Sequence, residues 1–312
     1  METYIKFKKI IKAEILFWLA IVVIALVTSC KNKVKTDDLA VKTDNVIAEV
    51  SIKQPTKTTP EFKAYWYAGE AEISSYKLEQ ARYGEMREGT AVLVYVTEDF
   101  LPEIQVKADY QNPENIPVLK LNATKKFNTG IYPYSIMQST FYPVSNNQHA
   151  IKVSSSIQEW CGHVYAQLNN REQFEIMSHS YFEREADERF KIDKTILENE
   201  LWTKLRINPE LLPTGNLQIV PSLEYTRLRH KTIKAYKATA TLNTGVYTIN
   251  YPSLNRTLTI HFNSNFPHDI LSWEETIGNQ TTKATKLKTI KSPYWNKNSN
   301  KDQVLRDTLQ LN

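Results

Sequence analysis

Alternation between apolar and polar residues, in segments separated by short turns, is the feature of this sequence that most constrains its fold. In residues 90–99, Val92 and Val94 would point to one face of an extended chain, and Leu93 and Tyr95 to the other. A period of two, with closely spaced turns rich in Asn, Gly and Pro, predicts antiparallel strands joined as a meander. The expected strands cover residues 71–82, 90–99, 102–109, 116–125, 132–144, 150–168, 173–183, 217–228, 232–243, 244–251, 255–262, 268–277 and 281–291.

One segment has the periodicity of a helix. In residues 194–205, Leu197, Leu201 and Leu205 recur at a spacing that places them on one helical face, and Asp193 is a suitable N-cap. We therefore predict a mainly β protein. Its large antiparallel sheet is curved into a half-barrel or a barrel-like meander, and one helix covers it.

Residues 1–30 have the three zones of an export signal. Several lysines precede the uninterrupted apolar run 15–27, which is shorter than the ~20 residues of a membrane-spanning helix. The run ends in Val27, Thr28, Ser29 and Cys30, which resemble the lipobox of bacterial lipoproteins. The resemblance implies a helical signal peptide at 1–29 that is cleaved, and a Cys30 that carries acyl chains such as palmitate. The alternative is an uncleaved membrane anchor with an incidental cysteine.

Composition divides the rest of the chain into three parts. Residues 30–60 are rich in Thr, Lys, Asp and Pro, which predicts a disordered tether. Residues 61–291 are the expected β-rich domain, and residues 292–312 a flexible C-terminal tail. Lys31 stands where an aspartate would favour retention in the inner membrane, so we expect attachment to the outer membrane, on its periplasmic or surface face.

Charge and cysteine content exclude some classes of protein. The formal net charge of +5 is too weak to indicate nucleic-acid binding. Once Cys30 is acylated, Cys161 is the one remaining thiol, so no intramolecular disulfide is expected. A lone cysteine of this kind is typical of a protein core.

Catalytic motifs are absent from the sequence. It contains neither a Walker loop nor a Gly-x-Gly-x-x-Gly turn, and no Gly-x-Ser-x-Gly elbow. The acidic run 183–188 also contains an arginine, which is typical of a solvated loop. We therefore expect neither an enzymatic activity nor a cofactor.

The clearest cluster of polar and aromatic side chains lies in the hairpin expected from residues 150–168 and 173–183. A three-residue turn at 170–172 would set His163 directly opposite His179. We expect their mixed face to be the concave, pocket-forming side, and the apolar face with Trp160 and Val164 to pack on the helix or on the rest of the core. The candidate pocket residues are Tyr134, Cys161, His163, Tyr165, Met177, His179 and Tyr181.

Three interpretations of this mixed face are open from the sequence. It forms a hydrogen-bonded polar stripe of the sheet, or it lines a polar binding pocket. In the third interpretation His163, His179 and Cys161 hold zinc, but no sequence-local ligand spacing supports this, and we predict no metal.

The sequence resembles a family of exported Bacteroidetes proteins over roughly residues 60–277. Residues 65–84, 94–100, 131–137 and 159–163 carry the resemblance. It implies a lipoprotein and no particular activity. Members are often labelled septum formation inhibitor, a label taken from cytoplasmic α/β nucleotide pyrophosphatases, whose N-terminal Ser-x-Ser-Pro-Arg motif this chain lacks.

A second resemblance is architectural. Long antiparallel strands, a covering helix and the segment 255–262 followed by Phe266 and Pro267 are similar to half-barrel lipoprotein-carrier proteins of the periplasm. Those carriers bind acyl chains in their concave side. The resemblance therefore implies a lipid or another amphipathic ligand.

Together these features predict a non-enzymatic lipoprotein of the cell envelope, held to the membrane by its lipid anchor and binding a lipid or amphipathic ligand in a curved sheet. The first alternative is a structural or assembly adaptor that docks on an outer-membrane protein partner. The second is an enzyme of unknown reaction. A pocket with a continuous apolar lining favours the ligand, whereas a filled interior with an exposed apolar patch favours the adaptor.

We predict that Cys30→Ser abolishes both lipidation and processing, because the thiol is the acylated group in the lipobox hypothesis. Metabolic labelling with a fatty acid, followed by gel analysis, should show an unlabelled precursor of higher mass. Processing and labelling equal to wild type would contradict the hypothesis.

Overall fold

The structure is a computed structural model that describes residues 58–145 and 148–311. The predicted signal peptide, Cys30 and the tether up to residue 57 lie outside the described residues.

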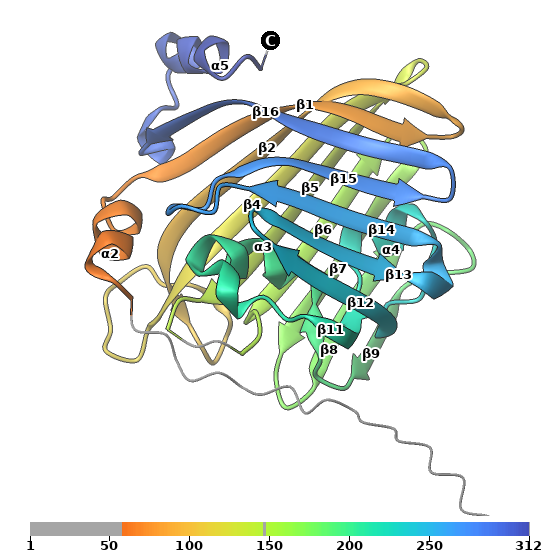
Figure 1. The fold of residues 1–312 in the computed structure, drawn as a ribbon, viewed down its shortest axis with the longest axis horizontal. Coiled ribbons are helices and arrows are strands. Elements are labelled where there is room, and N and C mark those ends of the chain that lie inside the picture. The colour runs from red at the N-terminus through yellow and green to blue at the C-terminus, as the bar shows by residue number, and fades with distance from the viewer. Residues whose placement is uncertain (1–57, 146–147, 312) are drawn as a thin grey trace, which may run out of the picture. The chain divides into compact units, whose positions relative to one another are not determined.

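The described residues build one large curved sheet of 16 strands, as the alternation predicts (Figure 1). Its order is β10-β11-β12-β13-β14-β15-β16-β1-β2-β4-β5-β6-β7-β8-β9, and the short β3 pairs with β2. The first nine strands are β1 (Ala71–Arg82), β2 (Glu85–Leu101), β3 (Val106–Lys107), β4 (Ile116–Thr129), β5 (Tyr132–Pro143), β6 (Lys152–Glu159), β7 (Gly162–Asn170), β8 (Phe174–Ser180) and β9 (Glu188–Ile192). The others are β10 (Ile196–Leu197), β11 (Gly215–Val220), β12 (Tyr236–Asn243), β13 (Val246–Tyr251), β14 (Arg256–Phe262), β15 (Ile270–Ile277) and β16 (Gln280–Ser292).

The sheet must curl strongly, because a short connection joins its two edges. β9 ends at Ile192 and β10 begins at Ile196, so the chain between the edge strands spans at most about 14 Å. A flat sheet with the same strand order would be roughly 65 Å wide at the usual strand spacing. β1 and β16 pair in the middle, and the sheet stays open between β9 and β10.

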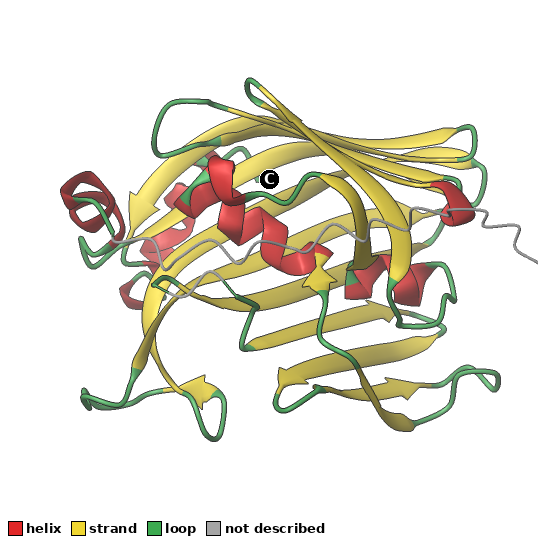
Figure 2. Ribbon diagram, turned by 60° about the horizontal axis from the view of Figure 1, so that its bottom comes forward, coloured by secondary structure: helices red, strands yellow, loops and turns green. Residues whose placement is uncertain are grey.

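Helices lie inside the curve of the sheet, where the sequence predicts one helix (Figure 2). They are α3 (Glu198–Ile207) and α4 (Leu223–Leu228). Leu201 and Leu205 of α3 are fully buried in the main core, which includes Tyr95 of β2. The expected apolar face of the helix therefore contacts the concave side of the sheet.

The predicted helix start is wrong by four residues, because Ile196–Leu197 pairs with β11 as β10 instead of entering the helix. The predicted strand 217–228 is also too long. β11 ends at Val220, and the Ser222 hydroxyl then caps α4 by accepting a hydrogen bond from the Tyr225 backbone nitrogen at 3.1 Å.

Two further expected strands differ in the structure. Residues 150–168 are not one strand, since a turn at Trp160 and Cys161 separates β6 from β7. In residues 102–109, the extended pairing is limited to Val106–Lys107.

Both ends of the described chain pack on the sheet. α2 (Pro60–Trp66) starts after Thr59, whose hydroxyl accepts from the Phe62 backbone nitrogen at 3.1 Å, and Phe62 and Trp66 are buried. The C-terminal segment, predicted to be a flexible tail, contains α5 (Val304–Thr308). Its Leu309 and Leu311 pack on Ala71 and Val96 of β1 and β2.

Within the described residues, no helix combines the length and the apolar character needed to cross a bilayer.

We predict that Leu201→Ala lowers the free energy of unfolding by about 2–5 kcal/mol, because Leu201 is 0% exposed between helix and sheet. Urea unfolding measures the change. The matched control is Leu271→Ala, at a side chain that is 42% exposed and should cost much less. Equal losses in the two variants would show that α3 is not part of the core.

Candidate functional site

Two buried ion pairs hold α3 on the concave face. At the first residue of the helix, the Glu198 carboxylate accepts hydrogen bonds from both terminal nitrogens of Arg256 on β14, at 2.5 and 2.7 Å. Near the last residue, Arg206 donates a second bidentate pair to Glu72 on β1, at 2.6 and 2.7 Å. All four side chains are at most 2% exposed. The bidentate geometry provides the hydrogen bonds that buried charges require, so position and direction of the helix are fixed.

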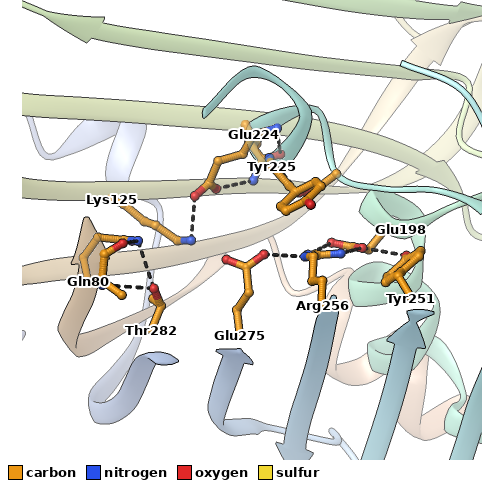
Figure 3. A network of polar contacts seen from close by, with 12 residues as sticks. Gln80, Lys125, Glu198, Glu224, Tyr225, Tyr251, Arg256, Glu275 and Thr282 are labelled. Carbon is orange, nitrogen blue, oxygen red and sulfur yellow. Dashed lines mark hydrogen bonds and ion pairs between the residues drawn. The ribbon is translucent and has the colours of Figure 1, made fainter. Parts of the chain in front are cut away.

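The pair at the start of α3 belongs to a wider buried network (Figure 3). Arg256 also donates from Nε to Glu275 Oε1 at 2.6 Å, and its guanidinium carbon lies 4.3 Å from the centre of the Tyr225 ring. Burial alone would raise the pKa of Glu275, but the charges of Arg256 and Lys125 outweigh burial and lower it. The Glu275 carboxylate therefore stays ionised in the interior.

α4 is held by polar side chains from β4 and β5. Lys125 Nζ lies 2.7 Å from Glu224 Oε1 (Figure 3). Gln138 Nε2 donates to Glu224 Oε2 at 2.8 Å. Asn199 of α3 donates to Gln138 Oε1 at 2.8 Å, which joins the two helices in one network. Burial disfavours the charge on Lys125, but Glu224 and Glu275 outweigh it and raise the pKa of Lys125.

The two helices fill most of the concave side and leave an inner cavity of about 60 Å³. Lys125, Glu224 and Glu275 line it together with apolar side chains such as Leu121 and Trp273. This volume has room for a few water molecules. It is far below the 300–1,000 Å³ typical of ligand pockets, so an acyl chain does not fit along the concave side as it is.

A larger cavity, of about 480 Å³, opens where the β1–β2 turn, the C-terminal end of α4 and the β8–β9 loop meet. We call it the mouth cavity. Arg82, Leu228 and Arg229 line both cavities, so the mouth lies directly beside the inner cavity. Its aromatic and aliphatic lining residues are Tyr83, Tyr134, Tyr181, Phe182, Ile157, Val164 and Leu228, and its other lining residues are Arg82, Gly84, Glu159, Cys161, Gly162, Arg227, Arg229, His230 and Gln280.

Arg82 lies at the boundary between the two cavities. It is 8% exposed and donates to three neutral acceptors: the Leu228 carbonyl at 2.9 Å, Tyr83 Oη at 3.1 Å and Tyr134 Oη at 3.2 Å. Burial and the hydrogen bond with Tyr83 raise the pKa of Tyr134, so its hydroxyl is neutral and does not offset the charge of Arg82.

Tyr181 closes one side of the mouth cavity against the β6–β7 turn. A Cβ atom on Gly162 would meet the Tyr181 ring at 2.3 Å, so the ring can lie there only because Gly162 has no side chain. Tyr181 donates to Glu159 Oε1 at 3.2 Å, and burial together with the Glu159 charge raises the pKa of Tyr181 to about 12. Its hydroxyl is therefore protonated at neutral pH.

The mouth cavity brings together three of the seven candidate pocket residues, Tyr134, Cys161 and Tyr181. Met177 lines a separate groove of about 360 Å³ on β8 and β9. The other three candidates line none of these cavities, and they are His163, Tyr165 and His179.

The predicted pairing of His163 with His179 is wrong. The three-residue turn falls at 171–173, one position later than expected, so Tyr165 faces His179. Both histidines stay on one face of the sheet, because the register shifts by two residues. His179 Nδ1 instead lies 3.3 Å from Asp187 Oδ1. Across residues 58–145 and 148–311, no three His, Cys, Asp or Glu side chains are grouped to hold a metal.

The prediction that the mixed face is concave is also wrong. Val164 and Leu168 are buried in the clusters beneath the helices, so the apolar face lines the concave side. His163 is exposed on the opposite face. Cys161 is exposed in the β6–β7 turn rather than buried in the core, and Trp160 beside it is 68% exposed. Because the helices fill the concave side, the apolar side chains of the sheet are removed from water when they face the helices.

The sequence does not predict that arginines line the mouth cavity. They are Arg82, Arg227 and Arg229. Two of these arginines follow Pro221 and Ser222, a proline and an N-cap residue that signal a helix start within the predicted strand. No sequence signal indicates that Arg82, at the end of β1, would be buried without an acidic partner.

Comparisons with known proteins show a limited structural likeness. No protein-family model matches the sequence, and no curated protein matches it. Among solved structures, a β-barrel-like protein of the domain of unknown function DUF1849 from Brucella abortus is similar, with 6% identity and a TM-score of 0.44. The match covers 71% of this chain and 98% of the other.

We predict that Glu72→Gln lowers the free energy of unfolding at pH 7 by about 3–5 kcal/mol, because it removes the bidentate counter-ion of the buried Arg206 and leaves Asp269, 3.8 Å away, as its acidic partner. Burial raises the pKa of Glu72, but Arg206 outweighs burial and the net pKa is lowered. The stabilisation is therefore complete above the unfolded-state pKa of about 4.3 and is lost as pH falls from there through the lowered folded-state pKa.

Urea unfolding between pH 7 and pH 3 measures both effects, and the variant should lose less stability on acidification than wild type. Glu274→Gln is the control, since Glu274 pairs with Lys283 at the surface, where the two side chains are 39% and 46% exposed. An equally small loss in both variants would contradict the role of the Glu72–Arg206 pair.

Proposed function

We propose that this protein is a lipoprotein of the cell envelope that binds an amphipathic ligand in the mouth cavity. The mouth cavity carries the proposal. Its volume of about 480 Å³ lies within the range of ligand pockets, and its lining joins aromatic and aliphatic side chains to a few charged groups. This combination suits a molecule with an apolar body and a polar end.

The ligand occupies the end of the sheet rather than its length. The inner cavity of about 60 Å³ leaves no room for an acyl chain beside α3 and α4. The apolar part of the ligand contacts the rings of Tyr134, Tyr181 and Phe182. In this respect the proposal differs from the carriers that hold acyl chains within the concave side.

The lipid anchor gives the mouth access to membrane molecules. With Cys30 acylated, residues 31–57, whose composition predicts a tether, would link the anchor to the domain. A domain on such a tether stays within reach of the bilayer. It can therefore take its ligand from the membrane or return it there.

The filled concave side and exposed apolar side chains at the same end of the sheet are the features expected of an adaptor, so they support a second function. Ile131 in the β4–β5 turn is 81% exposed, Trp160 in the β6–β7 turn is 68% exposed and Tyr83 in the β1–β2 turn is 59% exposed. Side chains of this size at successive turns are a surface on which an envelope protein would dock. In this alternative the protein is an adaptor, and Trp160→Ser would weaken association without removing a ligand.

We predict that Leu228→Trp removes a ligand that co-purifies with the wild-type protein, because the larger side chain fills a position that lines both cavities. Native mass spectrometry of protein extracted from its own envelope measures the bound mass. Leu271→Trp, at an exposed site outside the cavities, is the matched control and should keep the ligand. Wild-type protein without any bound small molecule would contradict the proposal.

A further inference from the structure

We infer that the ligand of the mouth cavity carries an anionic group, such as a phosphate or a carboxylate, that binds between Arg82 and Arg229. The inference rests on the proposed function and specifies the chemistry of its ligand.

The first observation is the uncompensated charge of Arg82. Within the described residues, no carboxylate oxygen lies within 4.0 Å of its guanidinium, and its Nε has no hydrogen-bond partner. The nearest acid along the hairpin, Glu85, pairs with Arg87 at 2.5 Å instead. A guanidinium that is 8% exposed and lacks a counter-ion is costly, and an anion bound in the adjoining cavity would remove that cost.

Aromatic rings partly stabilise Arg82 but do not neutralise it. Its guanidinium carbon lies 4.3 Å from the Tyr83 ring centre and 5.3 Å from that of Tyr134. Cation–π contacts and neutral acceptors hold the side chain in place and leave its full positive charge at the cavity boundary. This arrangement orients a cation before a ligand arrives.

The second observation is a further unpaired cation on the other side of the boundary. Arg229 follows α4 as its C-cap, is half-buried and lines both cavities. Among the described residues, its side chain has no hydrogen bond and no ion pair within 4.0 Å. The charge of Arg229 helps to lower the pKa of Glu275, but the Glu275 carboxylate accepts its hydrogen bond from Arg256, at 2.6 Å.

The remaining charges of the mouth do not cancel these two arginines. Arg227 and His230 both contact Glu185, at 3.2 and 2.8 Å, so the Glu185 carboxylate offsets the positive charge of Arg227. Glu159 is the one acidic residue among the described lining residues, and it accepts from the Cys161 backbone nitrogen at 2.7 Å on the turn. The net charge of the lining is therefore positive, next to the aromatic rings that would contact an apolar chain.

The test is calorimetric titration of the full-length protein, in nanodiscs of the neutral, phosphate-free lipid digalactosyldiacylglycerol, with three water-soluble probes. They are hexyl phosphate, hexyl glucoside and inorganic phosphate. We expect hexyl phosphate to bind about 10- to 100-fold more tightly than hexyl glucoside, the difference typical of charge-assisted hydrogen bonds. Inorganic phosphate, which lacks the apolar part, should bind more weakly than hexyl phosphate.

Variants separate ligand recognition from stability. Arg82→Gln and Arg229→Gln should each bring hexyl phosphate binding towards that of hexyl glucoside, whereas Arg82→Lys should retain part of the preference. Arg229→Gln removes no side-chain hydrogen bond or ion pair within the described residues, so it tests the site even if Arg82→Gln impairs folding. Arg87→Gln, on the same hairpin but outside the mouth cavity, is the control and should bind as wild type does.

Three results would overturn the inference. Equal binding of hexyl phosphate and hexyl glucoside, unchanged by Arg82→Gln and Arg229→Gln, would leave the amphipathic ligand in place but remove its anionic group. Inorganic phosphate binding as tightly as hexyl phosphate would indicate a site for free anions. Absence of binding by all three probes would overturn both the inference and the proposed function.

Discussion

The two bidentate Arg–Glu pairs at opposite ends of α3 are the interaction on which the rest of the structure depends. The helix contributes an acid at its first residue, Glu198, and a base near its last, Arg206, which also suits the helix dipole. A reversed helix would place acid against acid at Glu72 and base against base at Arg256. The direction of the helix is therefore specified by charge. Its buried leucines set how closely it packs on the sheet. Because β10 leads directly into α3, this position also brings the far edge of the sheet round towards β9.

The location of the proposed site follows from the position of the helices. α3 and α4 occupy the concave side that would otherwise accept a long ligand, and the Asn199–Gln138–Glu224 chain joins them. What stays open is the end of the sheet, where α4 finishes. There the carbonyl of Leu228 holds Arg82 in place. The same buried network that fills the half-barrel thus positions two cations beside an aromatic opening.

Sequence patterns predict the sheet well and the site only in part. Period-two alternation identifies β1 with the bounds seen in the structure, and it assigns Val94 and Tyr95 of β2 to opposite faces, because strand geometry is local. The predicted pairing of His163 with His179 is wrong, because a turn placed one position later changes every cross-strand partner in the hairpin. Which face of the sheet is concave depends on the helices that pack against it. The sequence did not predict α4, because its residues were assigned to the expected strand 217–228. The unpaired state of Arg82 depends on long-range packing, which no local pattern reports.

The most direct test of ligand binding at the mouth is a crystal structure of the protein purified from its own membrane, without added alkyl compounds. We expect an elongated molecule in the mouth cavity, with its apolar part on Tyr134 and Tyr181 and its polar end within hydrogen-bond distance of Arg82 or Arg229. A mouth cavity that contains only water, in a crystal where the purified protein retains a bound lipid elsewhere, would contradict the proposal.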